Sequence, residues 1–550
     1  MRRGILWAFA QVKGRIPSFL ALIVFTIVNG LSGLCVSLLM KAFIDIATYS
    51  SNLQPMFVVA LAIADLAVLG VTEILVSVLQ NRIACFVEKT LRRHLLDKLY
   101  RIPLQTYNSQ PTSVYLTRMT LDVEAVVKFL TDTSIVSIFN ECLLFLVSVF
   151  LIFALNWKMA LVLLTVFPLF LLCILRLSPK VHEISGRISK EEEKNRTLLQ
   201  EFLDKALLIR AYNTCVAAIR KMEAQYGAKQ SLAYRRSVLL GVMGFLNNFM
   251  GVGMFLIAMG FGVFLVLSGE TTMGSLVAMV NLVSFYYGPF LHISRWVSDI
   301  SSTRAAVQRI REILDQQDDD RPLAAPADGQ RIEEVRVEDL TFAYEGHPPV
   351  LRDVSALFAK GKVTAVVGES GSGKSTLLNN ILGFYQPSAG RVLGVCGDGT
   401  VLTGRLQNAI AYDSVNTSVL YGTLRENICM GDAWDEERFQ KTIRAVHLEA
   451  FYEEKGADFL LESGGKNLSS GQIRRVSLAR ALYRDRDILL FDEPTVNLDA
   501  ESIEAFWQNV ERLKADRICL IVTHDPRIVA LCDVVYSLEE GRLFRRDEAR

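Results

Sequence analysis

The stretch Gly368-Glu-Ser-Gly-Ser-Gly-Lys374-Ser375 decides the fold of the second half of this 550-residue chain. Its spacing, G-x-x-x-x-G-K-[ST], is that of a phosphate-binding loop. The five residues before it, Val363-Thr-Ala-Val-Val367, are typical of a buried strand, and Thr376 begins a helical pattern after it. Glycines let the backbone close around phosphate oxygens, while N–H groups at the helix start face the anion. The sequence therefore predicts a nucleoside triphosphate site.

A second motif supplies the carboxylates that such a site needs. Asp487-Ile-Leu-Leu-Phe-Asp492-Glu493 reads as a buried strand with two acids at its carboxyl end. We expect Asp492 to hold Mg²⁺ together with the Ser375 hydroxyl, and Glu493 to polarise the attacking water, a general-base role worth ~10²–10⁴-fold. The residues expected to bind ATP in the loop are Gly368, Ser370, Gly371, Ser372, Gly373, Lys374, Ser375 and Thr376.

The apolar residues, 51% of the chain, are concentrated ahead of this nucleotide site. A helix needs about 20 apolar residues to cross a bilayer. The sequence predicts six such spans in three pairs, at residues 16–40, 56–79, 134–155, 159–175, 237–268 and 271–293. The chain is therefore expected to be an integral membrane protein with the lipid bilayer as a partner.

The long polar segments between the pairs, 80–133 and 176–236, are rich in Lys and Arg, as is the N-terminus. The positive-inside rule puts the N-terminus, both segments and the nucleotide half in the cytoplasm, where ATP is found. We expect the membrane to be the bacterial cytoplasmic membrane. A formal net charge of +1 gives no reason to propose a nucleic acid as a partner.

Three acidic residues fall inside predicted spans: Asp65, Glu73 and Glu141. Ionisable groups at membrane depth are costly, so they are candidates for function. One interpretation is a polar cavity that favours cationic cargo. The other is that they lie near the interface or pair with basic residues of neighbouring helices.

Between the two nucleotide motifs lies Leu468-Ser469-Ser470-Gly471-Gln472, followed by a helical pattern. It resembles the signature sequence of ATP-binding cassette (ABC) transporters. Six spans ahead of one cassette resemble a half-transporter of the exporter fold, and the resemblance covers nearly the whole chain. The expected fold is an all-α membrane domain of six transmembrane helices followed by an α/β P-loop cassette. We expect domains at 1–312 and 333–550 with a linker at 313–332.

The resemblance implies roles for further residues. Tyr344, which is 24 residues before Gly368, matches the aromatic that stacks on adenine, and His524, 31 residues after Glu493, matches the histidine that contacts the γ-phosphate. Glu493 and His524 are thus the expected catalytic pair. In this family two cassettes close head to tail, so that the signature of one chain binds the ATP of the other. Asn497-Leu498-Asp499 matches the loop that crosses that interface, and residues 112–119 resemble a coupling helix.

The chain departs from the family pattern at two places. Val415 stands where a glutamine normally lies near Mg²⁺ and the water, and Asn416 substitutes only if the register shifts by one. Ser470 replaces a signature glycine and adds a Cβ to a close approach. Both departures concern communication between sites, since Glu493 and His524 are intact.

The sequence as a whole predicts half of an ATP-driven transporter that exports a small molecule, lipid or peptide by alternating access. Its cofactors are ATP and Mg²⁺, its transported substrate is unknown, and its partner is a second half-transporter in a homodimer or heterodimer. Two alternatives stay open: a coupling-impaired half of a heterodimeric transporter, and an ATP-gated regulator that moves no cargo.

Overall fold

The computed structural model describes residues 7–131, 135–324, 326, 330–414, 419–496 and 498–546. The chain forms two compact units. The membrane unit comprises Met1–Tyr100 and Pro111–Gln316, and the cassette unit comprises Arg101–Gln110 and Gln317–Arg550. Each unit is described by itself below.

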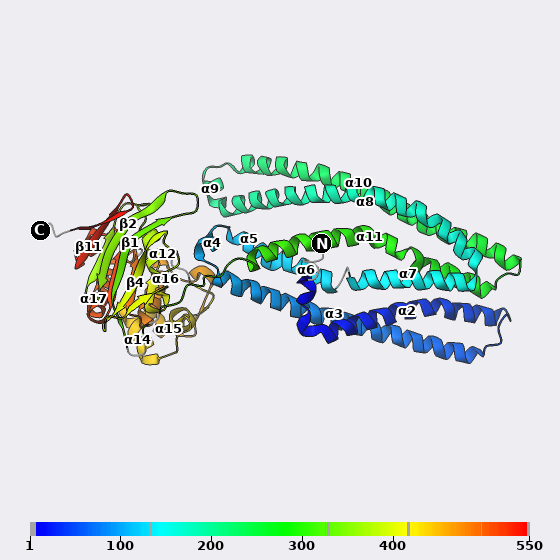
Figure 1. The fold of residues 1–550 in the computed structure, drawn as a ribbon, viewed down its shortest axis with the longest axis horizontal. Coiled ribbons are helices and arrows are strands. Elements are labelled where there is room, and N and C mark those ends of the chain that lie inside the picture. Colours follow the sequence, from blue (N-terminus) through cyan, green and yellow to red (C-terminus); the bar gives the residue numbers. More distant parts are fainter. Residues whose placement is uncertain are drawn as a thin grey trace. The chain divides into compact units, whose positions relative to one another are not determined.

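A long helix occupies each of the six predicted spans within the described residues (Figure 1). Four helical stretches there are long and apolar enough to cross a membrane by length and composition alone: Lys13–Ala47, Pro55–Arg101, Thr112–Leu155 and Cys215–Leu267. The long helices are α2 (Ile16–Ala47), α3 (Pro55–Arg101), α7 (Ile135–Leu155), α8 (Trp157–Asp204), α10 (Cys215–Leu267) and α11 (Met273–Leu314). Shorter helices between them are α4 (Leu104–Asn108), α5 (Thr112–Thr117), α6 (Val123–Thr131) and α9 (Ala206–Ala211).

The long helices begin at capping residues and pack through apolar faces. Asn156 accepts the backbone N–H groups of Lys158 and Met159 at the start of α8, and Thr272 accepts that of Ser275 at the start of α11. Helices α8 and α10 run side by side, and α11 packs on both α2 and α7 (Figure 1). Because the buried core draws residues from α2, α7, α8, α10 and α11, the unit holds these helices around one apolar centre.

Two buried carboxylates tie α11 to the rest of the membrane unit. Asp45, near the end of α2, accepts the Gly274 N–H at 3.2 Å and forms an ion pair with Lys41 at 2.9 Å. A carboxylate at a helix N-terminus is favourable because the first N–H groups of the helix lack backbone partners. Asp122 binds the guanidinium of Arg309 on α11 and that of Arg118 on the π-helical turn Arg118–Asp122.

The cassette unit is built on three sheets of described strands. An antiparallel sheet has the order β2-β1-β4-β5, a mainly parallel sheet has the order β12-β11-β3-β10-β9-β6, and β7 pairs with β8. The strands are β1 (Ile332–Ala343), β2 (Pro349–Ala359), β3 (Val363–Val367), β4 (Ala389–Cys396), β5 (Val401–Thr403), β6 (Ile410–Asp413), β7 (Gly422–Thr423), β8 (Leu460–Leu461), β9 (Ile488–Asp492), β10 (Ile518–Val522), β11 (Val534–Glu539) and β12 (Arg542–Arg546).

Helices cover the parallel sheet, and its central strands are buried on both faces. Side chains of β9 alternate between two apolar clusters, with Ile488 and Leu490 in one and Leu489 and Phe491 in the other. A parallel strand covered on both faces requires such a continuous apolar run. The helices are α12 (Lys374–Ile381), α13 (Leu424–Cys429), α14 (Glu436–Ala445), α15 (Glu449–Lys455), α16 (Ser470–Tyr483), α17 (Ala500–Leu513) and α18 (Pro526–Val529).

The segment 101–110, which carries α4, belongs to the cassette unit, whereas the predicted coupling segment 112–119 belongs to the membrane unit. Leu104 packs against the cassette core, and the backbone carbonyl of Arg101 accepts the Asp319 N–H at 2.8 Å. Pro103 and Pro111 are the N-cap residues of α4 and α5. The expectation that residues 112–119 form a coupling helix stays a prediction.

The close contact between α2 and α11 makes a prediction about Gly274. A Cβ added there meets Asp45 Oδ1 and the Lys41 carbonyl oxygen at 2.4 Å, whereas a Cβ at Gly253 of α10 meets nothing within 4 Å. We expect Gly274→Ala to lower the free energy of unfolding by ~1–3 kcal/mol through overpacking. Gly253→Ala is expected to be neutral or slightly stabilising, as alanine favours helix. Thermal unfolding of the full chain in lipid nanodiscs measures both, and equal stability of the two variants would contradict the contact.

Candidate functional site

The candidate site lies where parallel strands end at one edge of the large sheet. In register, Val522 of β10 pairs with Asp492 of β9 and with Val366 of β3, while Asp413 of β6 pairs with Phe491. The loops that follow β3, β9 and β10 therefore leave the sheet together. This is the edge at which open α/β sheets bind their ligands, and it carries the predicted loop, Glu493 and His524.

The loop from Gly368 to Ser375 has the backbone shape that its glycines predict. Gly371 and Gly373 lie in the left-handed region, with φ of 85° and 107°. A Cβ on Gly368 would stand 2.6 Å from the Leu538 carbonyl oxygen, so the sheet leaves no room for a side chain. The Lys374 ammonium donates to the carbonyl oxygens of Gly368 and Glu369 at 2.7 and 2.8 Å. Its charge is thus held at the loop mouth.

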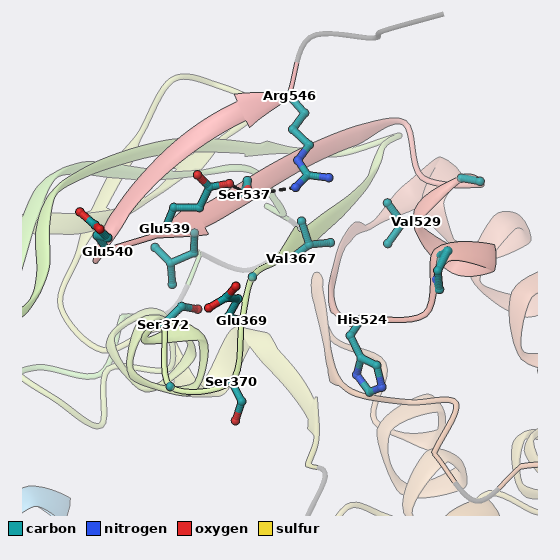
Figure 2. A pocket seen from close by; sticks show the side chains of 15 residues that line it. Val367, Glu369, Ser370, Ser372, His524, Val529, Ser537, Glu539, Glu540 and Arg546 are labelled. Carbon is teal, nitrogen blue, oxygen red and sulfur yellow. Dashed lines mark hydrogen bonds between the residues drawn. The ribbon is translucent and has the colours of Figure 1, made fainter.

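An open cleft of about 880 Å³ borders this loop (Figure 2). Its walls are the loop itself, the segment that carries His524 and the β11–β12 hairpin. Ser370 and His524 line it from two sides, and Arg546 lies at the far side with its guanidinium hydrogen-bonded to Ser537 (Figure 2). The loop is therefore accessible from solvent.

Glu493 and His524 form a pair. His524 Nδ1 lies 2.8 Å from Glu493 Oε1, and the His524 backbone N–H donates to Glu493 Oε2 at 3.4 Å. Glu493 is only 14% exposed in its side chain whereas His524 is 74% exposed. The carboxylate is thus fixed inside the site, and the imidazole extends towards solvent, which are suitable positions for a base and for a contact to an incoming phosphate.

Asp492 and Ser375 fit a Mg²⁺ ion by their chemistry. Burial and the Glu493 carboxylate raise the pKa of Asp492 to about 6, while the charges of Arg474 and Lys374 act in the opposite direction. Mg²⁺ is usually held by one or two protein oxygens together with substrate phosphates, and the Asp492 carboxylate and Ser375 hydroxyl are oxygens of this kind.

Tyr344 follows β1 and contacts the helix that begins at the loop. Its hydroxyl lies 3.1 Å from Thr376 Oγ1, and its ring packs edge-on against Phe342 and Tyr385 with centroids 5.1 and 5.8 Å apart. An open cleft of about 1050 Å³ begins beside Tyr344, and its lining includes Gln105 and Asn108 of the α4 segment. Sequence reasoning missed this juxtaposition because α4 is more than 200 residues away along the chain.

The segment Leu468-Ser469-Ser470-Gly471-Gln472 forms the start of α16. Ser469 Oγ accepts the Gln472 N–H at 3.2 Å and Gln472 Oε1 accepts the Ser469 N–H at 2.9 Å, a reciprocal capping box. Ser469 and Ser470 are exposed, while Leu468, Gly471 and Gln472 are half-buried. Within its own chain the Ser470 side chain therefore faces solvent at the helix start, which presents its N–H groups outward.

Asp499 caps α17 and joins it to the signature helix. Its Oδ1 accepts the Ser502 N–H at 2.8 Å, and its Oδ2 pairs with the Arg475 guanidinium at 2.9 Å. Hydrogen bonds from Ser502 and the charge of Arg475 lower the pKa of Asp499. Asp499 is thus an ionised group on the same surface as the start of α16.

Comparison with known proteins identifies the family. The model of the ABC transporter transmembrane region matches residues 19–290, and the ABC transporter model matches residues 351–496. The chain belongs to the ABC transporter family. A membrane-spanning region and an ABC ATPase domain are fused in this one chain, so the predicted family and fold class are confirmed.

The relatives of this ABC transporter include full-length matches. An ATP-dependent lipid A-core flippase of Desulfotalea psychrophila (strain LSv54 / DSM 12343) is 26% identical over 546 residues, which cover 96% of this chain and 93% of that protein. A mycobactin import ATP-binding/permease protein of Mycolicibacterium smegmatis is 36% identical over 291 residues, 52% of this chain and 50% of that one. The solved structure of a bacterial Atm1-family ABC exporter with ATP bound shares the fold, with a TM-score of 0.77, 19% identity and 97% and 94% coverage of the two chains.

The three acidic residues predicted for a cavity of this transporter have different surroundings. Asp65 accepts a hydrogen bond from the Ser32 hydroxyl of α2, and Glu141 on α7 lies 3.8 Å from His292 Nε2 of α11. Glu73 is exposed within the single chain. Asp65 and Glu141 therefore face polar groups of neighbouring helices.

Three residues of the predicted site lie outside the described residues. They are Val415 and Asn416, in the loop that the family uses for a glutamine, and Asn497, in the predicted interface loop. The expectations for them stay predictions.

If Tyr344 stacks on adenine, substituting it should affect recognition of the base and not recognition of the phosphates. We expect Tyr344→Ala to weaken ATP binding by ~1–3 kcal/mol, the usual contribution of a stacked base, and to leave binding of inorganic tripolyphosphate unchanged. Tyr344→Phe keeps the ring and removes only the hydroxyl, which contacts Thr376 and Tyr385, so it serves as the control. Titration calorimetry on the full chain measures these affinities. Equal losses for ATP and tripolyphosphate would show that the substitution damages the loop and not a stacking surface.

Proposed function

We propose that this chain is one half of an ATP-driven exporter, completed by a second ABC half-transporter that is either another copy of the chain or a different one. The observation that carries the proposal is the Glu493–His524 pair beside the phosphate-binding loop, in a chain whose other unit consists of membrane-length helices. The exposed start of α16 supports the need for a partner, because the family resemblance assigns Ser469 and Gly471 to the ATP of the opposite chain.

The loop residues bind and orient the triphosphate in this proposal. Lys374 exchanges its contacts with the Gly368 and Glu369 carbonyl oxygens for the β- and γ-phosphates. Ser375 and Asp492 would hold Mg²⁺, which would neutralise charge on the phosphate oxygens. Tyr344 positions the base, and the N–H groups of residues 369–376 surround the phosphates at the start of α12.

Glu493 polarises the attacking water, and His524 holds the γ-phosphate. The carboxylate suits this role because its two oxygens are already oriented by the Nδ1 atom and the backbone N–H of His524. ATP binding closes the two cassettes, and hydrolysis with product release reopens them. The spans of the two halves follow by alternating access, with the N-terminus and the cassette in the cytoplasm.

The cargo proposed is a small molecule, a lipid or a peptide. The lipid A-core flippase similar to this chain over nearly its full length supports a lipid or amphipathic molecule. The partial relative named for mycobactin import shows that direction varies among similar proteins. Export is therefore the part of the proposal that needs a flux measurement, with cargo accumulated against its gradient in sealed vesicles.

We expect the purified full chain in lipid nanodiscs to hydrolyse ATP and Glu493→Gln to reduce kcat by ~10²–10⁴-fold, the range for loss of a general base, while ATP binding is kept. Glu504→Gln on the exposed side of α17 is the matched control and is expected to leave kcat unchanged, since Glu504 is exposed and accepts a hydrogen bond from Gln508 of its own helix. Turnover assays with mass photometry of the same samples measure activity and oligomeric state together.

The turnover and mass measurements distinguish a homodimer from a heterodimer. A dimer with Glu493-dependent turnover identifies a homodimer. A monomer, or a dimer with background turnover that still binds ATP, identifies a missing second half, to be found by co-purification. Turnover that is the same in wild type and Glu493→Gln would contradict the role of the carboxylate.

A further inference from the structure

Arg474 is a nearly fully buried arginine that the mechanism above does not use. It lies on α16 two residues after Gln472, with 3% of its side chain exposed, and pairs with Asp413, which is 0% exposed, at 2.7 Å. A buried arginine needs partners for its donors, because an unpaired polar group inside a protein is costly. The partners of this one come from two separate segments of the cassette, the ends of β6 and β9.

The guanidinium of Arg474 binds the backbone around Glu493. Its Nη2 donates to the Glu493 carbonyl oxygen at 3.0 Å and its Nε donates to that of Pro494 at 3.1 Å. Glu493 itself has a φ of 48°, in the left-handed region that residues other than glycine rarely adopt. The neighbouring backbone contact is the Glu493 N–H with the Val522 carbonyl oxygen at 2.8 Å. The arginine therefore holds the outer side of a strained turn whose inner side is fixed by β10.

Asp413 and Ser414 connect the same guanidinium to the end of β6. Asp413 uses both carboxylate oxygens, Oδ2 with Arg474 and Oδ1 with the Ser477 hydroxyl at 2.7 Å. Arg474 Nη1 donates to the Ser414 carbonyl oxygen at 2.8 Å. In the sequence Ser414 directly precedes Val415, the position where the family pattern has a glutamine. One guanidinium thus links the Glu493 turn, the signature helix and the end of β6.

We propose that Arg474, held in place by Asp413, is a positioning residue for Glu493. Its donors keep the left-handed turn closed, so that the Glu493 carboxylate stays oriented towards His524 and the attacking water. The same contacts join the Glu493 turn to Ser414 at the end of β6, giving the hydrolytic centre a polar connection that does not depend on the side chain at position 415. This inference rests on the proposed ATPase function.

The simpler explanation is a buried ion pair that serves folding only. Removing one partner of such a pair leaves an uncompensated charge and is strongly destabilising. Single variants of Arg474 or Asp413 would therefore mix misfolding with loss of positioning. Neutral double variants avoid this problem, because both charges are removed together.

Two double variants distinguish the effect of losing the hydrogen-bond donors of Arg474 from the effect of losing its charge. Asp413→Asn with Arg474→Met has no donors for the carbonyl oxygens of Glu493 and Pro494, whereas Asp413→Asn with Arg474→Gln keeps an amide donor. We expect the Met double variant to lose about 10²-fold in kcat, the effect of a misplacement of about 1 Å, with an unchanged KM for ATP. We expect the Gln double variant to recover at least about tenfold of that loss.

Arg480 provides the matched control on the same helix. It is half-buried, and its donors bind the carbonyl and side-chain oxygens of Asn427. Arg480→Met is expected to lower the unfolding temperature without changing the kcat of the folded protein. If the Met and Gln double variants turn over equally fast, or if both match the wild type, the positioning role is wrong.

Hydrogen exchange supplies a readout that does not require turnover. In the full chain, peptides covering 488–496 should exchange faster in the Met double variant than in the Gln double variant or Arg480→Met. If the wild-type chain binds ATP but does not hydrolyse it, the chain is not a self-sufficient ATPase. The expected difference in hydrogen exchange between the variants does not depend on that result. Equal exchange in all variants would overturn the positioning role whatever the activity of the wild type.

Discussion

The register of the parallel sheet is the constraint on which the candidate site depends. Every residue of β3, β9 and β10 is buried, so these strands offer no polar side chain to a ligand until Asp492 at the end of β9. Because parallel neighbours end at one edge, the loops that follow the strands meet there. Strand pairing alone brings Gly368, Glu493 and His524 together. The side-chain contact between Glu493 and His524 then adds to an arrangement that the backbone already determines.

The same burial explains which parts of the site the sequence predicts. A strand covered on both faces must be continuously apolar, and a phosphate loop must carry glycines at fixed spacing, so both leave local signals. The six membrane helices leave an equally local signal in their length. Arg474 and Asp413 leave none, because they are 61 residues apart and each reads as an ordinary surface charge until the fold pairs them. The α4 segment was missed for the same reason, since its position on the cassette depends on Leu104 packing against a distant core.

In the membrane unit, polar groups inside the apolar helices are satisfied by partners on other helices. Asn29 of α2 donates to Thr72 Oγ1 of α3 at 3.0 Å, and Ser32 one turn away donates to Asp65. Such contacts fix the rotation of one helix against another at membrane depth, where apolar packing alone discriminates weakly. Asp45 does the same at the end of α2 by capping α11. Acidic residues that the sequence suggested for cargo thus include some whose visible contacts are between helices of the same chain.

A buried ion pair is a poor way to stabilise a cassette, because desolvating both charges offsets most of their attraction. Its value lies in specifying one geometry, since a guanidinium has donors in fixed directions and loses them all if the backbone around it moves. At Glu493 the backbone adopts a conformation that its own preferences oppose, and hydrolysis needs that conformation to be unique. An apolar core at positions 413 and 474 would tolerate several arrangements of the turn. The arginine permits only the arrangement in which the carbonyl oxygens of Ser414, Glu493 and Pro494 all accept its hydrogen bonds. Burying its charge costs free energy, and the result is a single orientation of the catalytic carboxylate.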